Sequence, residues 1–96
     1  MLKIGPFQNS SKVIIAPMAG VTDQPFRNLC RSKGAFWVVS EMVTSDQKLW
    51  HTNKSSHRLQ FGSEAEPRWV QIAGADPDML AEAAISNEQL GAQIID

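Results

Sequence analysis

Few side chains in this sequence have the type and spacing to do chemistry on their own. The single cysteine, Cys30, shares a predicted helical face with Phe26 and Leu29, and no positive group is fixed nearby to activate its thiol. We therefore expect Cys30 to pack as a small apolar residue. His51 and His57 lie in a polar connector without a spaced partner, and no Cys/His spacing is typical of zinc. We expect ordinary surface histidines and no metal site.

Two polar side chains stand at or near the ends of strand-like runs. Glu41 closes the run 36–41, and Gln71 falls near the end of the run 68–74. Glu41 could face the mouth of an active site or make a buried polar contact to a neighbouring loop, and we assign it no role. The amide of Gln71 offers both a donor and an acceptor, which suits a ligand but also the backbone of a loop.

Aromatic and basic residues give weak signs of contact with RNA. Residues 1–60 carry eight Lys/Arg against three Asp/Glu, whereas residues 61–96 carry one against seven. A basic half can face an acidic partner, but these cations are scattered and suit ordinary solvated faces. Trp50 lies outside any predicted strand and could stack on a base, whereas we expect Trp37 and Trp69 to pack.

Composition excludes several classes of protein. The 96 residues are 43% hydrophobic and 20% charged, with a net charge of −1, which is typical of a folded globular chain. The longest apolar stretch, 13–21, contains Pro17 and Gly20 and is far short of the roughly 18 to 20 residues of a membrane span. This short stretch leads us to expect no membrane partner. One cysteine cannot form an internal disulfide, so we expect a reducing, cytoplasmic compartment.

Strand-like runs alternate with helical patterns along the chain, which predicts an α/β fold with parallel strands. The run 13–16 is apolar without alternation, which suits a strand buried on both faces. The other runs begin near residues 37, 69 and 93, so the spacings are 24, 32 and 24 residues. A (β/α)₈ barrel repeats about every 31 residues, although a doubly wound sheet gives similar spacings.

The first of two clear helices has both a start and a stop signal. Thr22 or Asp23 can cap it, Pro25 is tolerated in its opening turn, and Gly34 follows its end. Shorter elements are less distinct. We expect short helices around 45–51 and 55–60, and a loop over 62–67.

The second helix is the clearest element of the chain. Asp76 caps it, Pro77 takes its first position and Gly91 ends it. Its apolar face is predicted to comprise Met79, Leu80, Ala83, Ala84 and Leu90.

The segment APMAGVTDQPFR, residues 16–27, resembles the start of the tRNA-dihydrouridine synthase family, and most closely its B-type bacterial members. Further agreement comes from SEM at 40–42, from VQIAG at 70–74 with the following DP, and from GAQIID at 91–96. These segments together cover nearly the whole chain. The first is specific, whereas the shorter ones would be weak alone.

The resemblance implies an FMN-carrying (β/α)₈ barrel that reduces the C5–C6 double bond of uridines in tRNA, with NADPH as the reductant of the flavin. In that family hydride passes from the reduced flavin to C6, and a cysteine protonates C5. The cysteine lies in a motif just after the fourth strand, so we expect the proton donor immediately beyond Asp96. We therefore expect residues 1–96 to be a partial barrel domain of three and a half βα units, the N-terminal portion of such an enzyme.

The resemblance also assigns binding residues. Pro17, Met18 and Ala19 would line the flavin through backbone contacts, and Gln71 would give its side-chain amide to the polar edge of the isoalloxazine ring. Barrel ligands sit at the carboxyl ends of strands, where a turn of little bulk lets the backbone approach a flat ring. We expect the chain alone to be inactive, to hold no FMN stably and, with parallel strands uncovered, to aggregate or pair with a second copy.

Two other interpretations stay open from the sequence. One is a non-catalytic module that keeps the opening segment and binds RNA or a protein through the basic residues of its first 60 positions. The other is a different FMN-dependent barrel oxidoreductase, of dihydroorotate or ene-reductase type, although residues 17–27 argue against it. The sequence does not indicate which uridine of tRNA is modified.

Overall fold

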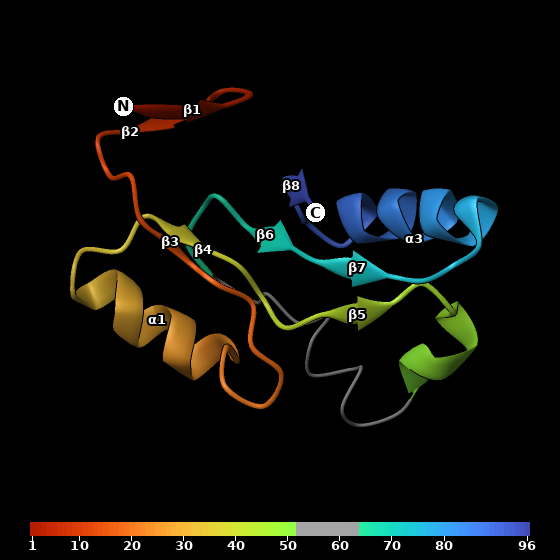
Figure 1. Ribbon diagram of the computed structural model, residues 1–96. Coiled ribbons are helices and arrows are strands. Elements are labelled where there is room, and N and C mark those ends of the chain that lie inside the picture. The colour runs from red at the N-terminus through yellow and green to blue at the C-terminus, as the bar shows by residue number, and fades with distance from the viewer. Residues whose placement is uncertain (52–63) are drawn as a thin grey trace.

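The computed structural model describes residues 1–51 and 64–96, and these form a mixed arrangement of helices and short strands (Figure 1). The predicted helix at 55–60 lies outside the described residues, and so does His57. The predicted short helix near 45–51 is confirmed as the 3₁₀ helix η1, Gln47–His51.

The chain begins with a hairpin that the sequence analysis did not anticipate. Strands β1, Leu2–Ile4, and β2, Phe7–Asn9, pair antiparallel around a two-residue turn. Gly5 adopts a φ of 56°, which glycine reaches without the steric cost of a Cβ. Figure 1 shows the hairpin standing apart from α1, and Pro6 of its turn lines a hollow together with residues 91–93, which precede β8.

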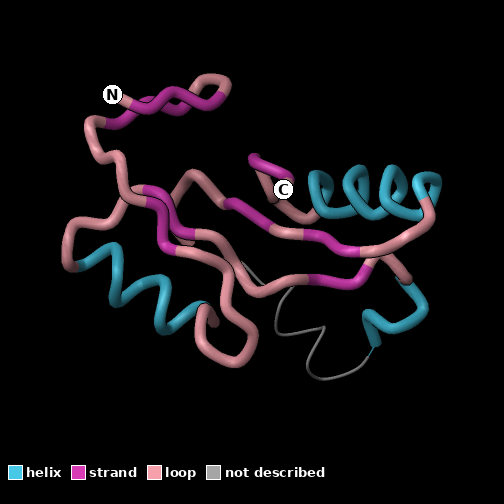
Figure 2. The backbone as a smooth tube through the Cα atoms, in the orientation of Figure 1, coloured by secondary structure: helices cyan, strands magenta, loops and turns pink. Residues whose placement is uncertain are grey.

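Three pairs of parallel strands form the centre of the molecule. Strand β3, Ile14–Ile15, pairs with β4, Trp37–Val38. Strand β5, Val43–Thr44, pairs with β7, Ile72–Ala73, and β6, Trp69–Val70, pairs with β8, Ile94–Ile95. The predicted parallel pairing is therefore confirmed for the described residues, and Figure 2 shows these short strands, in magenta, between α1 and α3.

The pairs are joined to one another because the predicted third strand changes partner at Gln71. Its first half, β6, pairs with β8, and its second half, β7, pairs with β5. Val39 forms a parallel bridge to Trp69, and the Ser40 N–H donates to the Trp69 carbonyl at 2.9 Å. The segments that contain β3, β4–β5, β6–β7 and β8 thus lie next to one another in chain order.

Both predicted helices form with the expected caps. In α1, Gln24–Ser32, the Asp23 carboxylate accepts the Phe26 N–H at 3.0 Å, and Gly34 follows with a φ of 101°. In α3, Pro77–Gln89, the Asp76 carboxylate accepts the Asp78 N–H at 2.9 Å. Gly91 follows α3 with a φ of 112°. A side-chain acceptor at each start and a glycine after each end are sequence-local signals, which is why these bounds were predictable.

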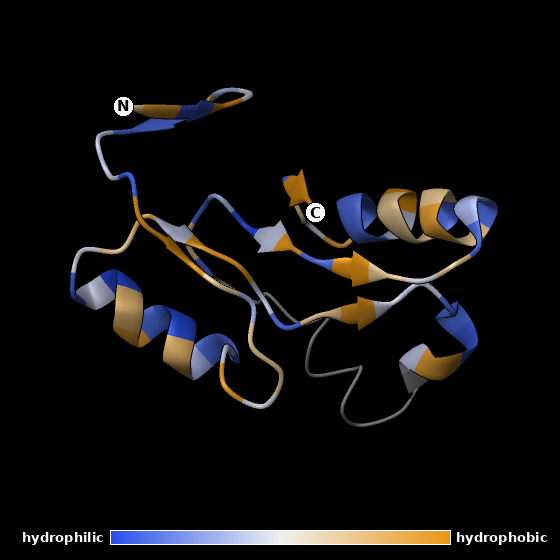
Figure 3. Ribbon diagram, in the orientation of Figure 1, coloured by the Kyte–Doolittle hydropathy of each residue, from blue (hydrophilic) through white to orange (hydrophobic). Residues whose placement is uncertain are grey.

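The core lies along β4, β5 and β6, and apolar residues are concentrated on the strands in Figure 3. Trp37, Val38, Val43 and Val70 are fully buried. The prediction that 13–16 is buried on both faces is wrong, since Val13 is 67% and Ile14 42% exposed. Successive side chains of β3 point to opposite faces of the sheet: Ile15 is half-buried beside Leu29 and Cys30 of α1, whereas Ile14 is exposed on the other face.

The predicted apolar faces of the helices are also partly wrong. Leu29 is 55% exposed in α1, while the charged Arg27 is buried. Leu90 is 51% exposed after α3, and Asn87 takes the buried position one turn beyond Ala83. Asn87 can do so because its Nδ2 donates to the Ala83 carbonyl at 2.8 Å. Arg27 is thus buried where Leu29 was predicted to be, and Asn87 is buried where Leu90 was predicted to be. Polar side chains can take these buried positions because hydrogen bonds pair some of their polar atoms.

Candidate functional site

The segment that follows β3 folds into a closed turn. The N–H groups of Val21 and Thr22 donate to the Met18 carbonyl at 3.0 and 2.9 Å. The Met18 N–H donates to the Thr22 Oγ1 at 2.9 Å, and Thr22 is fully buried. Gly20 has a φ of 76°, which favours glycine at this position. We call residues 17–22 the β3–α1 turn.

Of the three binding residues predicted in this turn, two are exposed and one is half-buried. Pro17 is half-buried, Met18 is 41% exposed and Ala19 is exposed. A Cβ built on Gly20 would meet no atom within 4 Å. The backbone at Ala19 and Gly20 therefore carries little side-chain bulk, and the space beside Gly20 is open, as a surface that approaches a flat ring requires.

Glu41 fixes this turn from the neighbouring strand segment. It is 8% exposed, and its carboxylate accepts the N–H of Gly20. Of the two alternatives that the sequence left for Glu41, the structure shows the buried contact to a neighbouring loop.

Gln71 lies at the junction of β6 and β7 and is half-buried. Its backbone carbonyl accepts the Val43 N–H at 2.8 Å. Its side-chain Nε2 donates to the Asp96 Oδ2 at 3.1 Å, so the amide contacts a carboxylate and not the backbone of a loop. The amide nitrogen is thereby directed to Asp96, and the oxygen is left as an acceptor.

The segment 41–43 connects the predicted binding residues. Glu41 contacts the β3–α1 turn through Gly20, and Val43 contacts Gln71. Because the strands run parallel, the β3–α1 turn, Glu41 and Gln71 follow their strands at the same edge of the sheet. The structure thus brings the turn and Gln71 to one edge, with segment 41–43 between them.

Three hollows on the surface lie away from these residues. One of about 530 Å³ lies between η1 and α3, one of about 370 Å³ beside β3 and α1, and one of about 420 Å³ under the β1–β2 turn. Their linings include Ser45 and Glu82, Ile15 and Cys30, and Phe7 and Arg68, respectively. Pro17, Met18, Ala19 and Gln71 line none of them.

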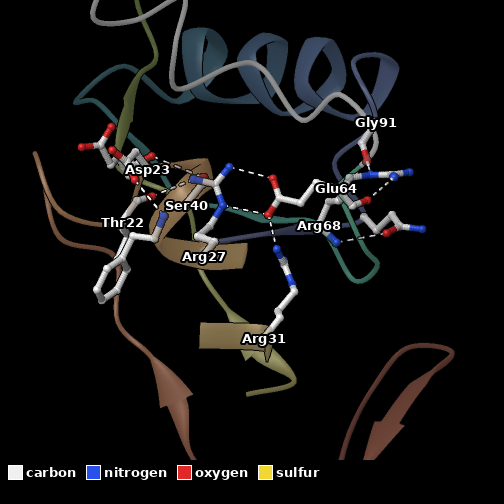
Figure 4. A network of polar contacts seen from close by, with 11 residues as sticks. Thr22, Asp23, Arg27, Arg31, Ser40, Glu64, Arg68 and Gly91 are labelled. Atoms are coloured by element: carbon white, nitrogen blue, oxygen red, sulfur yellow. Dashed lines mark hydrogen bonds and ion pairs between the residues drawn. The ribbon is translucent and has the colours of Figure 1, made fainter. Parts of the chain in front are cut away.

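A highly charged buried contact joins α1 to the segment that precedes β6 (Figure 4). The Arg27 Nε and Nη2 donate to the two Glu64 carboxylate oxygens at 2.8 and 2.7 Å. The Arg27 and Glu64 side chains are 2% and 1% exposed. The remaining Arg27 nitrogen, Nη1, donates to the Thr22 carbonyl at 2.6 Å. Arg27 therefore connects Glu64 to the β3–α1 turn.

Two more arginines complete this network. The Arg31 Nη1 donates to the Glu64 Oε2 at 2.6 Å. Arg68 donates to the Glu64 backbone carbonyl at 3.1 Å and to the Gly91 carbonyl at 2.8 Å. Burial alone would raise the pKa of Glu64, but the hydrogen bonds and charges of Arg27 and Arg31 outweigh it and hold that pKa below its ordinary value. Glu64 is thus a buried carboxylate held in its charged form.

Sequence reasoning missed this network. The sequence places Arg27 in the resemblance segment 16–27 and among the scattered basic residues, without a role of its own, and it places Glu64 in a predicted loop. The available signal was the pair Arg27 and Arg31, which lie one turn apart on a helix and so share a face. That spacing predicts a shared anionic partner but does not identify it, because Glu64 is 37 residues from Arg27.

The remaining candidates have packing roles. Cys30 is half-buried and lines an apolar hollow with Ile15. The expectation that Trp50 could stack on RNA is not supported, because its Nε1 donates to the Thr44 carbonyl at 2.7 Å and its ring packs on the core cluster. The described residues contain no group of three or more His, Cys, Asp or Glu that could hold a metal. Within the same ranges, no helix is long and apolar enough to span a membrane.

The class of protein follows from a comparison with protein families. The family model described as dihydrouridine synthase (Dus) matches residues 14–96, which include the β3–α1 turn, Gln71 and the Glu64 network. The chain belongs to the dihydrouridine synthase family, and the predicted resemblance is confirmed.

Comparison with individual proteins shows which members of this family the chain is similar to. The chain is 62% identical over 96 residues to tRNA-dihydrouridine synthase B of Pseudomonas aeruginosa, 59% over 95 residues to that of Pseudomonas syringae pv. tomato, and 55% over 95 residues to that of Xanthomonas axonopodis pv. citri. These matches cover 99–100% of this chain. The chain spans 28–29% of the length of these curated relatives. No solved structure matches it.

Proposed function

We propose that the complete gene product carrying residues 1–96 is a flavin-dependent tRNA-dihydrouridine synthase. It would reduce the C5–C6 double bond of uridine in tRNA, with FMN as cofactor and NADPH as reductant. The observation that carries this proposal is the 62% identity, over every residue of the chain, to a protein named tRNA-dihydrouridine synthase B. The tRNA substrate and a cytoplasmic location are part of the same proposal.

The fold supports a barrel assignment. We infer that residues 1–96 are a partial domain that supplies the first three and a half βα units of a (β/α)₈ barrel. The support is parallel pairing between strand segments that neighbour one another in chain order, with α1 and α3 in the connections. The isolated chain is proposed to associate with itself, because Val13 and Ile14 are exposed at the β3 edge.

The residues at the edge of the sheet fit a flavin in their chemistry. When bound, FMN would supply the hydride that reduces the base. The β3–α1 turn, through Pro17, Met18 and Ala19, would offer its backbone and low bulk to the ring, and the open space at Gly20 supports this. Gln71, whose Nε2 is directed to Asp96, would present its carbonyl oxygen to an N–H of the polar ring edge.

The proton donor of the reaction is not Cys30 in this proposal. Cys30 lies beside Ile15 in an apolar hollow, on the helix that leaves the β3–α1 turn. We assign the protonation of C5 to a cysteine that follows Asp96, as the family motif implies. Cys30→Ala should therefore leave the rate of dihydrouridine formation unchanged.

The experiment that tests the proposed function is an assay of dihydrouridine in tRNA from a strain that lacks its own dihydrouridine synthases. The purified complete gene product, with FMN and NADPH, should convert uridine to dihydrouridine, and Gln71→Ala should lose at least about tenfold in flavin affinity. Gln89→Ala, at an exposed position of α3, is the matched control and should behave as wild type.

Other outcomes of this assay identify the alternatives. Flavin binding without any product in tRNA would favour a different FMN-dependent oxidoreductase. Binding of tRNA without flavin or product would favour a non-catalytic RNA-binding module. An unchanged flavin affinity in Gln71→Ala would show that the assignment of Gln71 is wrong.

A further inference from the structure

The β3–α1 turn is held from two sides by charged side chains. On one side the Glu41 carboxylate accepts the N–H of Gly20. On the other the Arg27 Nη1 donates to the Thr22 carbonyl at 2.6 Å. Both side chains are buried, at 8% and 2% exposure, so water competes weakly for these contacts. The turn is therefore fixed by charge-assisted hydrogen bonds as well as by its own backbone.

Arg27 can hold the turn only if its guanidinium is itself fixed. A guanidinium is a planar fork, and two parallel bonds to one carboxylate set its plane. Glu64 makes those bonds through both oxygens, at 2.7 and 2.8 Å, and this leaves Nη1 directed at Thr22. Glu64 does not contact the turn in these interactions, yet it determines where Arg27 points.

Glu64 is in turn held by two further arginines, Arg31 of α1 and Arg68, which precedes β6. Arg31 donates to the same carboxylate oxygen that accepts the Arg27 Nε. Arg68, whose guanidinium is also bonded to Gly91, donates to the Glu64 backbone carbonyl. The position of Glu64 is thereby tied to the start of β6 and to the end of α3, which are separate from the β3–α1 turn.

We propose that Glu64 is a positioning residue for the flavin-binding turn and acts through Arg27. The inference rests on the proposed function, in which the backbone of Pro17, Met18 and Ala19 contacts FMN. In Glu64→Gln the charged, two-oxygen acceptor is lost, so Arg27 no longer has a fixed plane and its bond to Thr22 loosens. The turn then samples other conformations, and a preformed flavin site loses affinity.

The test compares variants of the complete gene product in two measurements, the affinity for added FMN and the hydrogen exchange of single amides. Glu64→Gln should weaken FMN binding about tenfold, the order expected for one charge-assisted hydrogen bond. Arg27→Lys keeps the positive charge but cannot bond Glu64 twice and Thr22 as well, and it should give a similar loss. Glu66→Gln is the matched control, since the Glu66 side chain is 57% exposed, and it should bind FMN as wild type does.

Hydrogen exchange separates positioning from a general loss of structure. In Glu64→Gln and Arg27→Lys the amides of Gly20 and Thr22 should exchange about tenfold faster. The amides of Val43 and Ser45, which bond across β5 and β7, should keep their wild-type rates. If Glu64→Gln does not fold, the exchange rates of Arg27→Lys alone show whether the turn is loosened selectively.

Two results would overturn the proposal. One is unchanged exchange at Gly20 and Thr22 in whichever variants fold, and the other is acceleration of all measured amides alike. If the wild-type protein binds no FMN, the proposed function fails instead. The exchange measurement still shows in that case whether Glu64 holds the β3–α1 turn.

Discussion

Loss of the Glu64 charge should destabilise the chain more than any surface charge change. Glu64→Gln leaves Arg27 and Arg31, which are 2% and 12% exposed, without their anionic partner. Breaking a buried ion pair from one side costs about 3–5 kcal/mol, because the remaining charge stays buried. Since glutamine still offers one acceptor oxygen, we expect the lower end, about 3 kcal/mol of unfolding free energy.

The assay is urea unfolding of the complete gene product followed by tryptophan fluorescence. For a slope of about 2 kcal/mol per M of urea, a loss of about 3 kcal/mol moves the midpoint down by about 1.5 M. Glu66→Gln removes a solvent-exposed carboxylate that lies 3.6 Å from Arg68, and it should cost about 0.5 kcal/mol or less. A loss below about 1 kcal/mol for Glu64→Gln, with an unchanged slope, would refute the view of Glu64 as a buried anchor.

Further changes test other parts of the structure. Because folding lowers the pKa of Glu64, its stabilisation is fully present above the unfolded pKa of about 4.5 and is lost as the pH falls through the folded pKa. The difference in unfolding free energy between wild type and Glu64→Gln should therefore shrink as the pH is lowered below about 4.5, and a constant difference contradicts this. Gly74→Ala should cost about 1–3 kcal/mol in urea unfolding, since its Cβ would lie 1.8 Å from Ser45 Oγ, and Ser45→Gly in the same chain should recover most of that. Asp76→Ala should cost about 1 kcal/mol by thermal unfolding and Asp76→Asn much less; equal losses would mean that the cap does not act through its side-chain oxygen.

Much of the fold was predictable because its signals are local. Asp23 and Asp76 cap their helices from positions directly before them, and Gly34 and Gly91 end them. The division of the third strand at Gln71 had no such signal. The residues Arg68–Gly74 read as one strand, and the change of partner depends on where β5 and β8 lie.

The candidate site was predicted in part. The family resemblance pointed to Gln71 and to the β3–α1 turn, and the structure places both at one edge of the sheet. It did not identify Glu64: the one-turn spacing of Arg27 and Arg31 indicates an anionic partner, but that partner lies 37 residues from Arg27 and the spacing does not point to it. Leu29 was misplaced for the same reason, since Arg27 takes the buried side of α1 once Glu64 supplies its counter-charge.

The central claim, flavin-dependent reduction of tRNA, can be tested directly by flavin absorbance under anaerobic conditions. The complete gene product is loaded with FMN, reduced with NADPH until the flavin band is bleached, and freed of excess NADPH. Addition of tRNA without dihydrouridine should restore the oxidised band, because the base takes up the hydride. A band that stays bleached with that tRNA, in a protein that holds FMN and is reduced by NADPH, would contradict the account.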